Sequence, residues 1–317
     1  MIDVQRLTKR FGAVTAVDEL SFTVRPGIVT GFLGPNGAGK STTMRMILGL
    51  DRPTSGRATV DGRPYGEIDR PARHVGAVLD ANWVHPNRSA RSHLRWIAAA
   101  NAIPTSRVDA VLEQVGLTPV ARRSVGAFSL GMRQRLGIAG ALLGEPGVLI
   151  LDEPANGLDP DGILWLRRLV RDYAAGGRTV LLSSHLLAEV AGTVDQIILI
   201  GKGRLIADQP IADFLAASGP AEVRARVDRP DHLHAALAKQ NLPVRAETDD
   251  QGRPVLVVVG AATDEVGTLA RAADCTVWEL FTNRISLEEA FLKATDEAVE
   301  YRGPGATPHL IGEGTSR

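Results

Sequence analysis

The sequence predicts an α/β fold with a β-rich N-terminal layer and a helical subdomain, followed by a smaller α+β domain. Three observations lead to this prediction. Short apolar stretches separated by turns fill residues 1–33, and fully apolar runs alternate with helical patterns over residues 148–200. Residues 221–281 read strand, helix, strand, strand, helix, strand. A chain of 317 residues that is 44% hydrophobic and 23% charged is long enough for two such domains.

Charge and cysteine content exclude several classes of protein. The 36 basic and 36 acidic residues cancel, so no overall field attracts nucleic acid. Cys275 is the only cysteine, which excludes internal disulfides and thiolate metal clusters and fits a reducing cytoplasm. The longest aliphatic runs, at 148–151 and 255–259, are far shorter than the roughly 18 residues of a spanning helix. We therefore expect that the chain alone does not cross a bilayer.

The predicted elements divide the chain into two domains and a tail. The first domain spans residues 1–218 and contains a helical subdomain at about 87–145. Small residues and the pair Gly219-Pro220 predict a hinge after it. The βαββαβ order of residues 219–296 is typical of a ferredoxin-like sandwich, for which we expect an accessory or regulatory role. The Gly- and Pro-containing segment 297–317 is predicted to be disordered.

A phosphate-binding pattern lies between the third predicted strand and a helix. Residues 34–41, Gly-Pro-Asn-Gly-Ala-Gly-Lys-Ser, fit G-x-x-x-x-G-K-[ST], in which backbone N–H groups wrap phosphate oxygens. We expect Lys40 to neutralise the β- and γ-phosphates and Ser41 to ligate Mg²⁺. A chance glycine turn is a poor alternative because a strand and a helix flank the loop. The predicted phosphate-binding residues are Gly34, Pro35, Asn36, Gly37, Ala38, Gly39, Lys40, Ser41 and Thr42.

Two carboxylates, Asp152 and Glu153, follow the apolar run at 148–151. They are expected at the carboxyl edge of the parallel sheet, beside the phosphate loop. Asp152 is placed to hold Mg²⁺ and Glu153 to polarise the attacking water as a general base. An Asp-Glu-Pro sequence after a strand is most often a solvated turn, so this interpretation depends on the partnership with Lys40. Together the motifs predict a P-loop ATPase.

Further motifs carry a specific resemblance. Residues 128–136, Phe-Ser-Leu-Gly-Met-Arg-Gln-Arg-Leu, resemble the ABC signature motif, and residues 156–159, Asn-Gly-Leu-Asp, resemble the D-loop. Ser184-His185 resembles the switch histidine, and Phe11 in Lys-Arg-Phe-Gly resembles the aromatic residue that stacks on adenine. The sequence is therefore similar to the ATP-binding cassettes of ABC transporters over about residues 1–215.

The resemblance implies the remaining site residues, ligands and partners. Catalysis is expected from Glu153, His185 and Lys40, and additional ATP contacts from Phe11, Ser129, Gly131 and Asp159. Ser129 caps a helix that would face the γ-phosphate held by another cassette. With one P-loop and one signature, the chain would pair with a second copy or a related cassette. It would bind ATP and Mg²⁺ and serve a separate membrane permease from the cytoplasmic side of the membrane, with no nucleic-acid partner.

The sequence departs from the family pattern at two places. Phe128, Leu130 and Met132 occupy three positions of the usual Leu-Ser-Gly-Gly-Gln, while Ser129 and Gly131 are kept. Asp80 stands where the Q-loop glutamine is expected, and as a shorter acceptor it is predicted to contact Mg²⁺ through water.

Both departures resemble the exporter branch associated with daunorubicin and bacitracin self-resistance, as do residues 82–86 and 278–291. This likeness implies export of a drug, antibiotic or lipid-like compound, with Trp83 and His85 on the surface that meets the membrane subunit. For Trp83, simple packing under a loop is an equal alternative. The alternative is a non-transport ABC ATPase of translation or DNA repair. Such proteins resemble fused pairs of cassettes or a cassette split by a coiled coil, and the sequence shows neither pattern. A GTPase is disfavoured because no Asn-Lys-x-Asp motif occurs.

Overall fold

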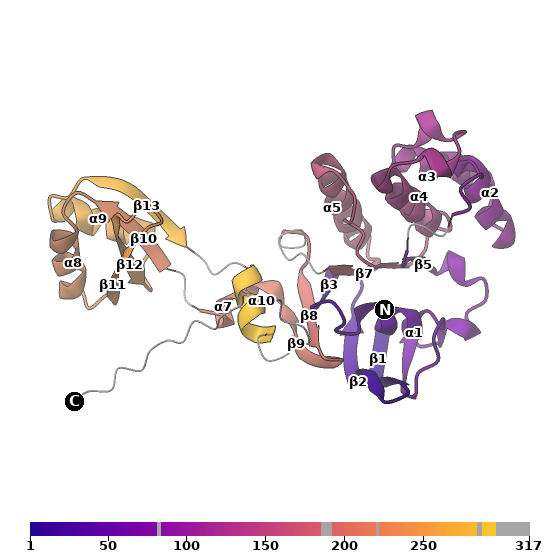
Figure 1. The fold of residues 1–317 in the computed structure, drawn as a ribbon, viewed down its shortest axis with the longest axis horizontal. Coiled ribbons are helices and arrows are strands. Elements are labelled where there is room, and N and C mark those ends of the chain that lie inside the picture. Colours follow the sequence, from indigo (N-terminus) through magenta and orange to yellow (C-terminus); the bar gives the residue numbers. More distant parts are fainter. Residues whose placement is uncertain (81–83, 185–191, 220–221, 284–286, 296–317) are drawn as a thin grey trace. The chain divides into compact units, whose positions relative to one another are not determined.

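The computed structural model describes residues 1–80, 84–184, 192–219, 222–283 and 287–295 (Figure 1). The strands are β1 (Ile2–Phe11), β2 (Val14–Val24), β3 (Val29–Leu33), β4 (Ser55–Val60), β5 (Val75–Val78), β6 (Val148–Leu151), β7 (Thr179–Ser184), β8 (Gln196–Gly201), β9 (Arg204–Pro210), β10 (Glu222–Val227), β11 (Val244–Thr248), β12 (Pro254–Val259) and β13 (Val277–Asn283). The α-helices are α1 (Lys40–Ile47), α2 (Ala90–Ala100), α3 (Ser106–Gln114), α4 (Leu130–Leu142), α5 (Pro160–Ala175), α7 (Ile211–Ala217), α8 (Pro230–Lys239), α9 (Thr263–Ala272) and α10 (Leu287–Thr295). Within these ranges, every helix is too short or too polar to cross a membrane.

A six-stranded sheet with the order β5-β6-β7-β3-β8-β9 forms the centre of the first compact unit, which contains Met1–Asp208. The strands from β5 to β8 run parallel to their neighbours. Every residue of β3, β6 and β7 is buried, which explains why these strands are mostly apolar and do not alternate with exposed polar residues. Only β7 separates β3 from β6, so the phosphate loop and Asp152 emerge at the same carboxyl edge.

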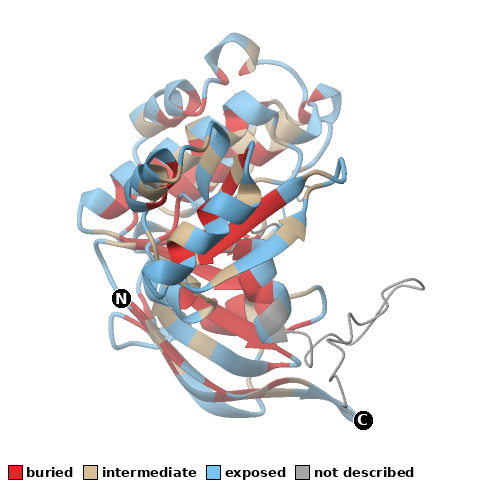
Figure 2. Ribbon diagram, turned by 90° about the vertical axis from the view of Figure 1, so that its left-hand side faces the viewer, coloured by how far each residue is buried: buried red, intermediate tan, exposed pale blue. Residues whose placement is uncertain are grey.

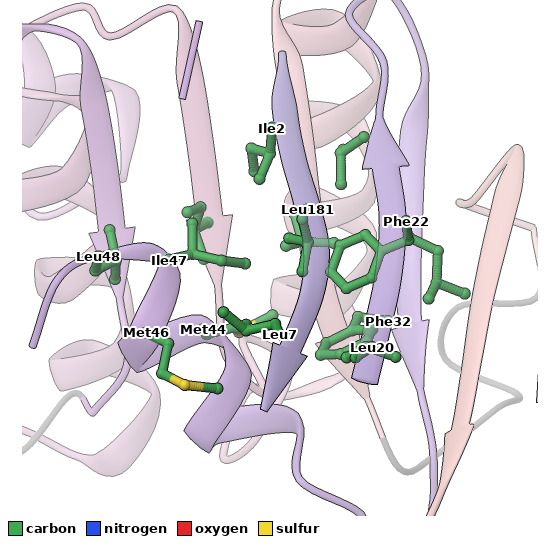
Figure 3. Close-up of a cluster of buried hydrophobic side chains, with 14 of the residues drawn as sticks. Ile2, Leu7, Leu20, Phe22, Phe32, Met44, Met46, Ile47, Leu48 and Leu181 are labelled. Carbon is green, nitrogen blue, oxygen red and sulfur yellow. The ribbon is translucent and has the colours of Figure 1, made fainter. Parts of the chain in front are cut away.

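The N-terminal residues form a separate antiparallel sheet with the order β2-β1-β4. Its apolar face joins helix α1 and the central sheet in one hydrophobic cluster (Figure 3). Phe22 of β2 and Phe32 of β3 pack with ring centroids 5.4 Å apart, and Met44 and Ile47 of α1 are fully buried beside them. In Figure 2 many strand residues are buried, whereas the helices carry exposed residues on one face. The position of the helix that follows the phosphate loop is thus set by packing on both sheets.

The chain between β5 and β6 contains the predicted helical subdomain, which consists of α2, α3 and α4. Leu94, Val111 and Leu136, one from each helix, are fully buried. The N-caps are Ser89, which accepts from the backbone N–H of Ser92, and Ser129, which accepts from that of Met132. Serine at these positions satisfies one of the free N–H groups of each first turn.

The second compact unit contains Gln209–Lys293. Its strands form an antiparallel sheet with the order β11-β12-β10-β13, and α8 and α9 complete the βαββαβ succession that the sequence predicts. The unit begins at Gln209, about ten residues before the predicted boundary at 218, because the chain leaves the central sheet at the end of β9 and α7 already belongs to the second unit. The predicted disordered tail lies outside the described residues.

Glycine at position 76 lets strand β5 approach helix α4. A Cβ atom there would lie 2.2 Å from the carbonyl oxygen of Ala141 and 2.9 Å from Cγ of Pro146. We expect Gly76→Ala to lower the free energy of unfolding by roughly 2–3 kcal/mol, because both neighbours must move. Urea unfolding monitored by circular dichroism measures this. Gly147→Ala is the control, since within the described part of the chain a Cβ at Gly147 meets nothing within 4 Å. Equal stability of the two variants would contradict the prediction.

Candidate nucleotide-binding site

The phosphate loop connects the end of β3 to the start of α1, as its sequence predicts. Gly37 and Gly39 have φ angles of 82° and 102°, a left-handed region that favours glycine. Gly39 also has no room for a side chain, since a Cβ there would lie 2.5 Å from the carbonyl oxygen of Ala16. The amide of Ala38 donates to the carbonyl of Pro35 at 3.1 Å, which closes the turn. Ser41 is exposed and Thr42 is half-buried in the first turn of α1.

Lys40 is the first residue of α1, and its side chain is only 7% exposed. The ammonium group donates to the carbonyl of Gly34 at 2.7 Å and lies 3.8 Å from Oε1 of Glu153. Burial lowers the pKa of Lys40, and the negative charges of Glu153 and Asp152 oppose that shift. The structure therefore brings together the lysine and the two carboxylates that the sequence singles out.

The two carboxylates differ in their surroundings. Asp152 is buried, whereas the side chain of Glu153 is 22% exposed. The backbone N–H of Asp152 donates to the carbonyl of Val78 at 2.7 Å, which ties the ends of β5 and β6 together. Glu153 has a φ of 49°, an uncommon conformation for a residue with a side chain. Such strain is often concentrated at functional sites.

Ser183 at the end of β7 is a site residue that sequence reasoning missed. Its hydroxyl donates to Oδ1 of Asp152 and accepts from the backbone N–H of Glu153 at 2.9 Å. Ser183 is fully buried, so this one hydroxyl orients both members of the acidic pair. The only sequence signal is a polar residue at the carboxyl end of an apolar strand.

Two other predicted site residues are helix caps. Ser129 accepts a hydrogen bond from the N–H of Met132 at 3.2 Å at the start of α4. Asp159 accepts from the N–H of Gly162 at 2.9 Å at the start of α5. Gly131 is half-buried in the first turn of α4, next to the turn that contains Gly157. The signature-like segment and the D-loop-like segment therefore adjoin each other.

The remaining residues that the sequence singles out are Phe11, Asp80, His185, Trp83 and His85. Phe11 ends β1 with its ring 52% exposed, and Nζ of Lys9 lies 5.0 Å from the ring centroid. Asp80 follows β5 and is exposed. His185 and Trp83 lie outside the described residues. His85 is exposed in the segment that precedes α2.

A cleft of about 350 Å³ lies beside Asp80, between β5 and the helices α2 and α4. Its lining is mostly apolar, including Ile97 and Leu136, and His93 is among the few polar groups. Burial lowers the pKa of His93, and the positive charge of Arg88 lowers it further. The cleft therefore favours a neutral imidazole beside apolar side chains.

Comparison with known proteins identifies the family. A family profile described as "ABC transporter" matches residues 17–156. The chain is 43% identical over 213 residues to the bacitracin transport ATP-binding protein BcrA of Bacillus licheniformis, covering 66% of this chain and 70% of that protein. The chain belongs to the ABC transporter family. It is the cassette that binds and hydrolyses ATP, with Mg²⁺ as cofactor.

The likeness extends beyond the cassette. The chain is 33% identical over 306 residues to Nod factor export ATP-binding protein I of Paraburkholderia xenovorans, covering 94% of this chain and 98% of that protein. A second profile, described as a domain of unknown function (DUF8746), matches residues 221–288. The solved "Structure of ATP binding subunit of ABC transporter" is similar with a TM-score of 0.63 and 28% identity, covering 68% of this chain and 92% of that one.

Removal of the Ser183 hydroxyl tests its place in the site. Ser183→Ala leaves Asp152 and the N–H of Glu153 without their shared partner, and hydrogen bonds to charged groups contribute about 1.5–3 kcal/mol. We expect ATP turnover to fall about tenfold or more and the Mg²⁺ requirement to rise, as measured by phosphate release across a Mg²⁺ titration.

A matched control is available on the neighbouring strand β3. Thr30 is fully buried, and its hydroxyl has no hydrogen-bond partner among the residues that the structure describes. Thr30→Val therefore removes a buried hydroxyl of the same sheet without breaking a hydrogen bond, and turnover should be retained. Normal turnover and normal Mg²⁺ dependence in Ser183→Ala would exclude the assigned role.

Proposed function

We propose that this chain energises export of an antibiotic-like or lipid-like compound through a separate membrane permease, from the cytoplasmic face of the membrane. One observation carries the ATPase part of this proposal: Lys40, Asp152 and Glu153 converge at one sheet edge. The export part is supported by likeness to proteins that are named for bacitracin transport and Nod factor export. The comparisons offer no support for the alternative, a non-transport ABC ATPase.

The residues at the sheet edge divide the chemistry of hydrolysis. The phosphate loop, from Gly34 to Thr42, would receive the phosphates, and Lys40 would offset their charge. The carboxylate of buried Asp152, which Ser183 holds, and the hydroxyl of Ser41 are oxygen donors of the kind that suits Mg²⁺, and the two residues would hold the ion. When bound, Mg²⁺ would supply charge neutralisation between the phosphates.

Glu153 is the candidate general base. It is more accessible to water than Asp152, and its carboxylate lies beside the lysine rather than being held by Ser183. A base in this position would accept a proton from the water that attacks the γ-phosphate. Phe11, with its exposed ring at the end of β1, is proposed to stack on adenine, and His185 to act beside Glu153.

The chain is proposed to work as one half of a pair of cassettes. It has one phosphate loop and one capped signature-like helix, and the cap at Ser129 leaves other N–H groups of the first turn of α4 free to bind an anion. In the pair, Ser129 and Gly131 of one cassette would face the phosphates held by the other. Asp159 already caps α5 and would set the position of the D-loop.

The cleft between β5, α2 and α4 is the proposed contact with the permease. Its apolar lining and volume of about 350 Å³ suit an apolar side chain of a docking helix. Asp80 borders the same cleft and follows the strand whose end binds the backbone of Asp152. A helix bound in the cleft would therefore contact β5 and, through β5, change the position of the acidic pair.

Substitution of Glu153 tests the ATPase assignment. Glu153→Gln should keep Mg-ATP binding, lower turnover by at least about a hundredfold and abolish transport, because the amide cannot accept the proton of the attacking water. Fluorescent-nucleotide binding, phosphate release and export from cells that also contain the permease measure these effects. Glu113→Gln, at an exposed carboxylate on α3, is the control. Wild-type turnover of Glu153→Gln would remove Glu153 from the mechanism.

We further propose that the sandwich of the second unit stabilises or regulates the transporter assembly rather than taking part in hydrolysis. Glu222 at the start of β10 pairs directly with Asn283 at the end of β13, so the sandwich begins and ends at adjacent points. A short glycine-serine linker can therefore replace residues 222–283. We expect ATP turnover to stay within about threefold, while copurification of the permease decreases. Undiminished copurification and transport would exclude this role.

A further inference from the structure

The side chain of Leu130, which is 44% exposed at the start of α4, lies against Gly157. A Cβ at position 157 would lie 2.3 Å from Cγ and 2.4 Å from Cδ2 of Leu130, distances that real atoms do not reach. Gly157 also has a φ of 78°. Two features therefore disfavour a side chain at position 157: the left-handed backbone conformation and the nearby side chain of Leu130.

The neighbouring residue strengthens the same contact. A Cβ at Gly131 would lie 2.7 Å from the carbonyl oxygen of Gly157. The first turn of α4 thus meets the D-loop-like turn through two adjacent residues, one covering Gly157 and the other approaching its carbonyl. Because α4 belongs to the helical subdomain and Gly157 follows the central strand β6, the contact joins the subdomain to the sheet edge.

Short hydrogen-bonded turns connect this contact to the catalytic carboxylate. The N–H of Asn156 donates to the carbonyl of Glu153 at 3.2 Å, and the N–H of Leu158 donates to that of Ala155 at 3.0 Å. These two turns link the position of Gly157 to the backbone of Glu153. On the other side, Leu130 directly follows the cap Ser129.

We infer that Leu130 and Gly157 form a positioning pair, in which the leucine side chain holds the D-loop turn and so fixes Glu153 relative to the Ser129 cap. The inference rests on the proposed function, which gives both ends of this link a role in hydrolysis. Leu130 stands where the signature motif usually has glycine, so the leucine fills a space that only a glycine at 157 leaves open. Neither residue touches the substrate in this scheme.

Gly157→Ala should lower turnover by at least tenfold while equilibrium binding of Mg-ATP to the full chain is retained, because small displacements of catalytic groups reduce rates strongly. The same change in a Leu130→Gly background should cost far less, since the atoms that the new methyl group would strike are gone. Leu130→Gly alone removes support from the turn and should lower turnover several-fold.

Gly177→Ala is the matched control for backbone strain. Gly177 has a φ of 77°, and a Cβ there meets no atom of the described residues within 4 Å. In the Leu130→Gly background, Gly157→Ala should cost no more than Gly177→Ala does. A loss that is equal in both backgrounds, or no loss in the wild-type background, would overturn the pairing. Inactive wild-type protein, or an active Glu153→Gln variant, would instead point to failure of the proposed function.

Discussion

The site depends on holding one buried ammonium group against two carboxylates at the edge of a parallel sheet. Burial disfavours the charged form of Lys40, and the nearby charges of Glu153 and Asp152 oppose that effect. The arrangement requires β3 and β6 to end at the same edge with only β7 between them. β7 also supplies Ser183, so the intervening strand sets both the spacing and the orientation of the acidic pair.

Local chemistry explains why much of the site could be read from the sequence. The phosphate loop needs glycine where φ is positive, so its pattern is visible in single residues such as Gly37 and Gly39. The carboxyl-edge rule then placed Asp152 and Glu153 near Lys40 without knowledge of the strand order. The α/β core and the helical subdomain followed from apolar periodicity, and the structure confirms both.

The parts that sequence reasoning missed all depend on contacts between distant segments. Ser183 resembles any polar residue at a strand end until β7 is placed beside β6. The closeness of Leu130 and Gly157 depends on how α4 packs against the turn after β6. Small residues near 217–220 predict a hinge there, whereas the second compact unit begins at Gln209, where the chain leaves the central sheet along β9.

The sandwich begins at Glu222 and ends at Asn283, and these two residues pair directly with each other. β10 has β12 and β13 as its two neighbours, so the sheet cannot close around it until the last strand has left the ribosome. The central sheet and the helical subdomain of the first unit, by contrast, are synthesised before the sandwich. A module closed on itself in this way can be gained, lost or exchanged between transporters at a single point of the chain without disturbing the ATPase core.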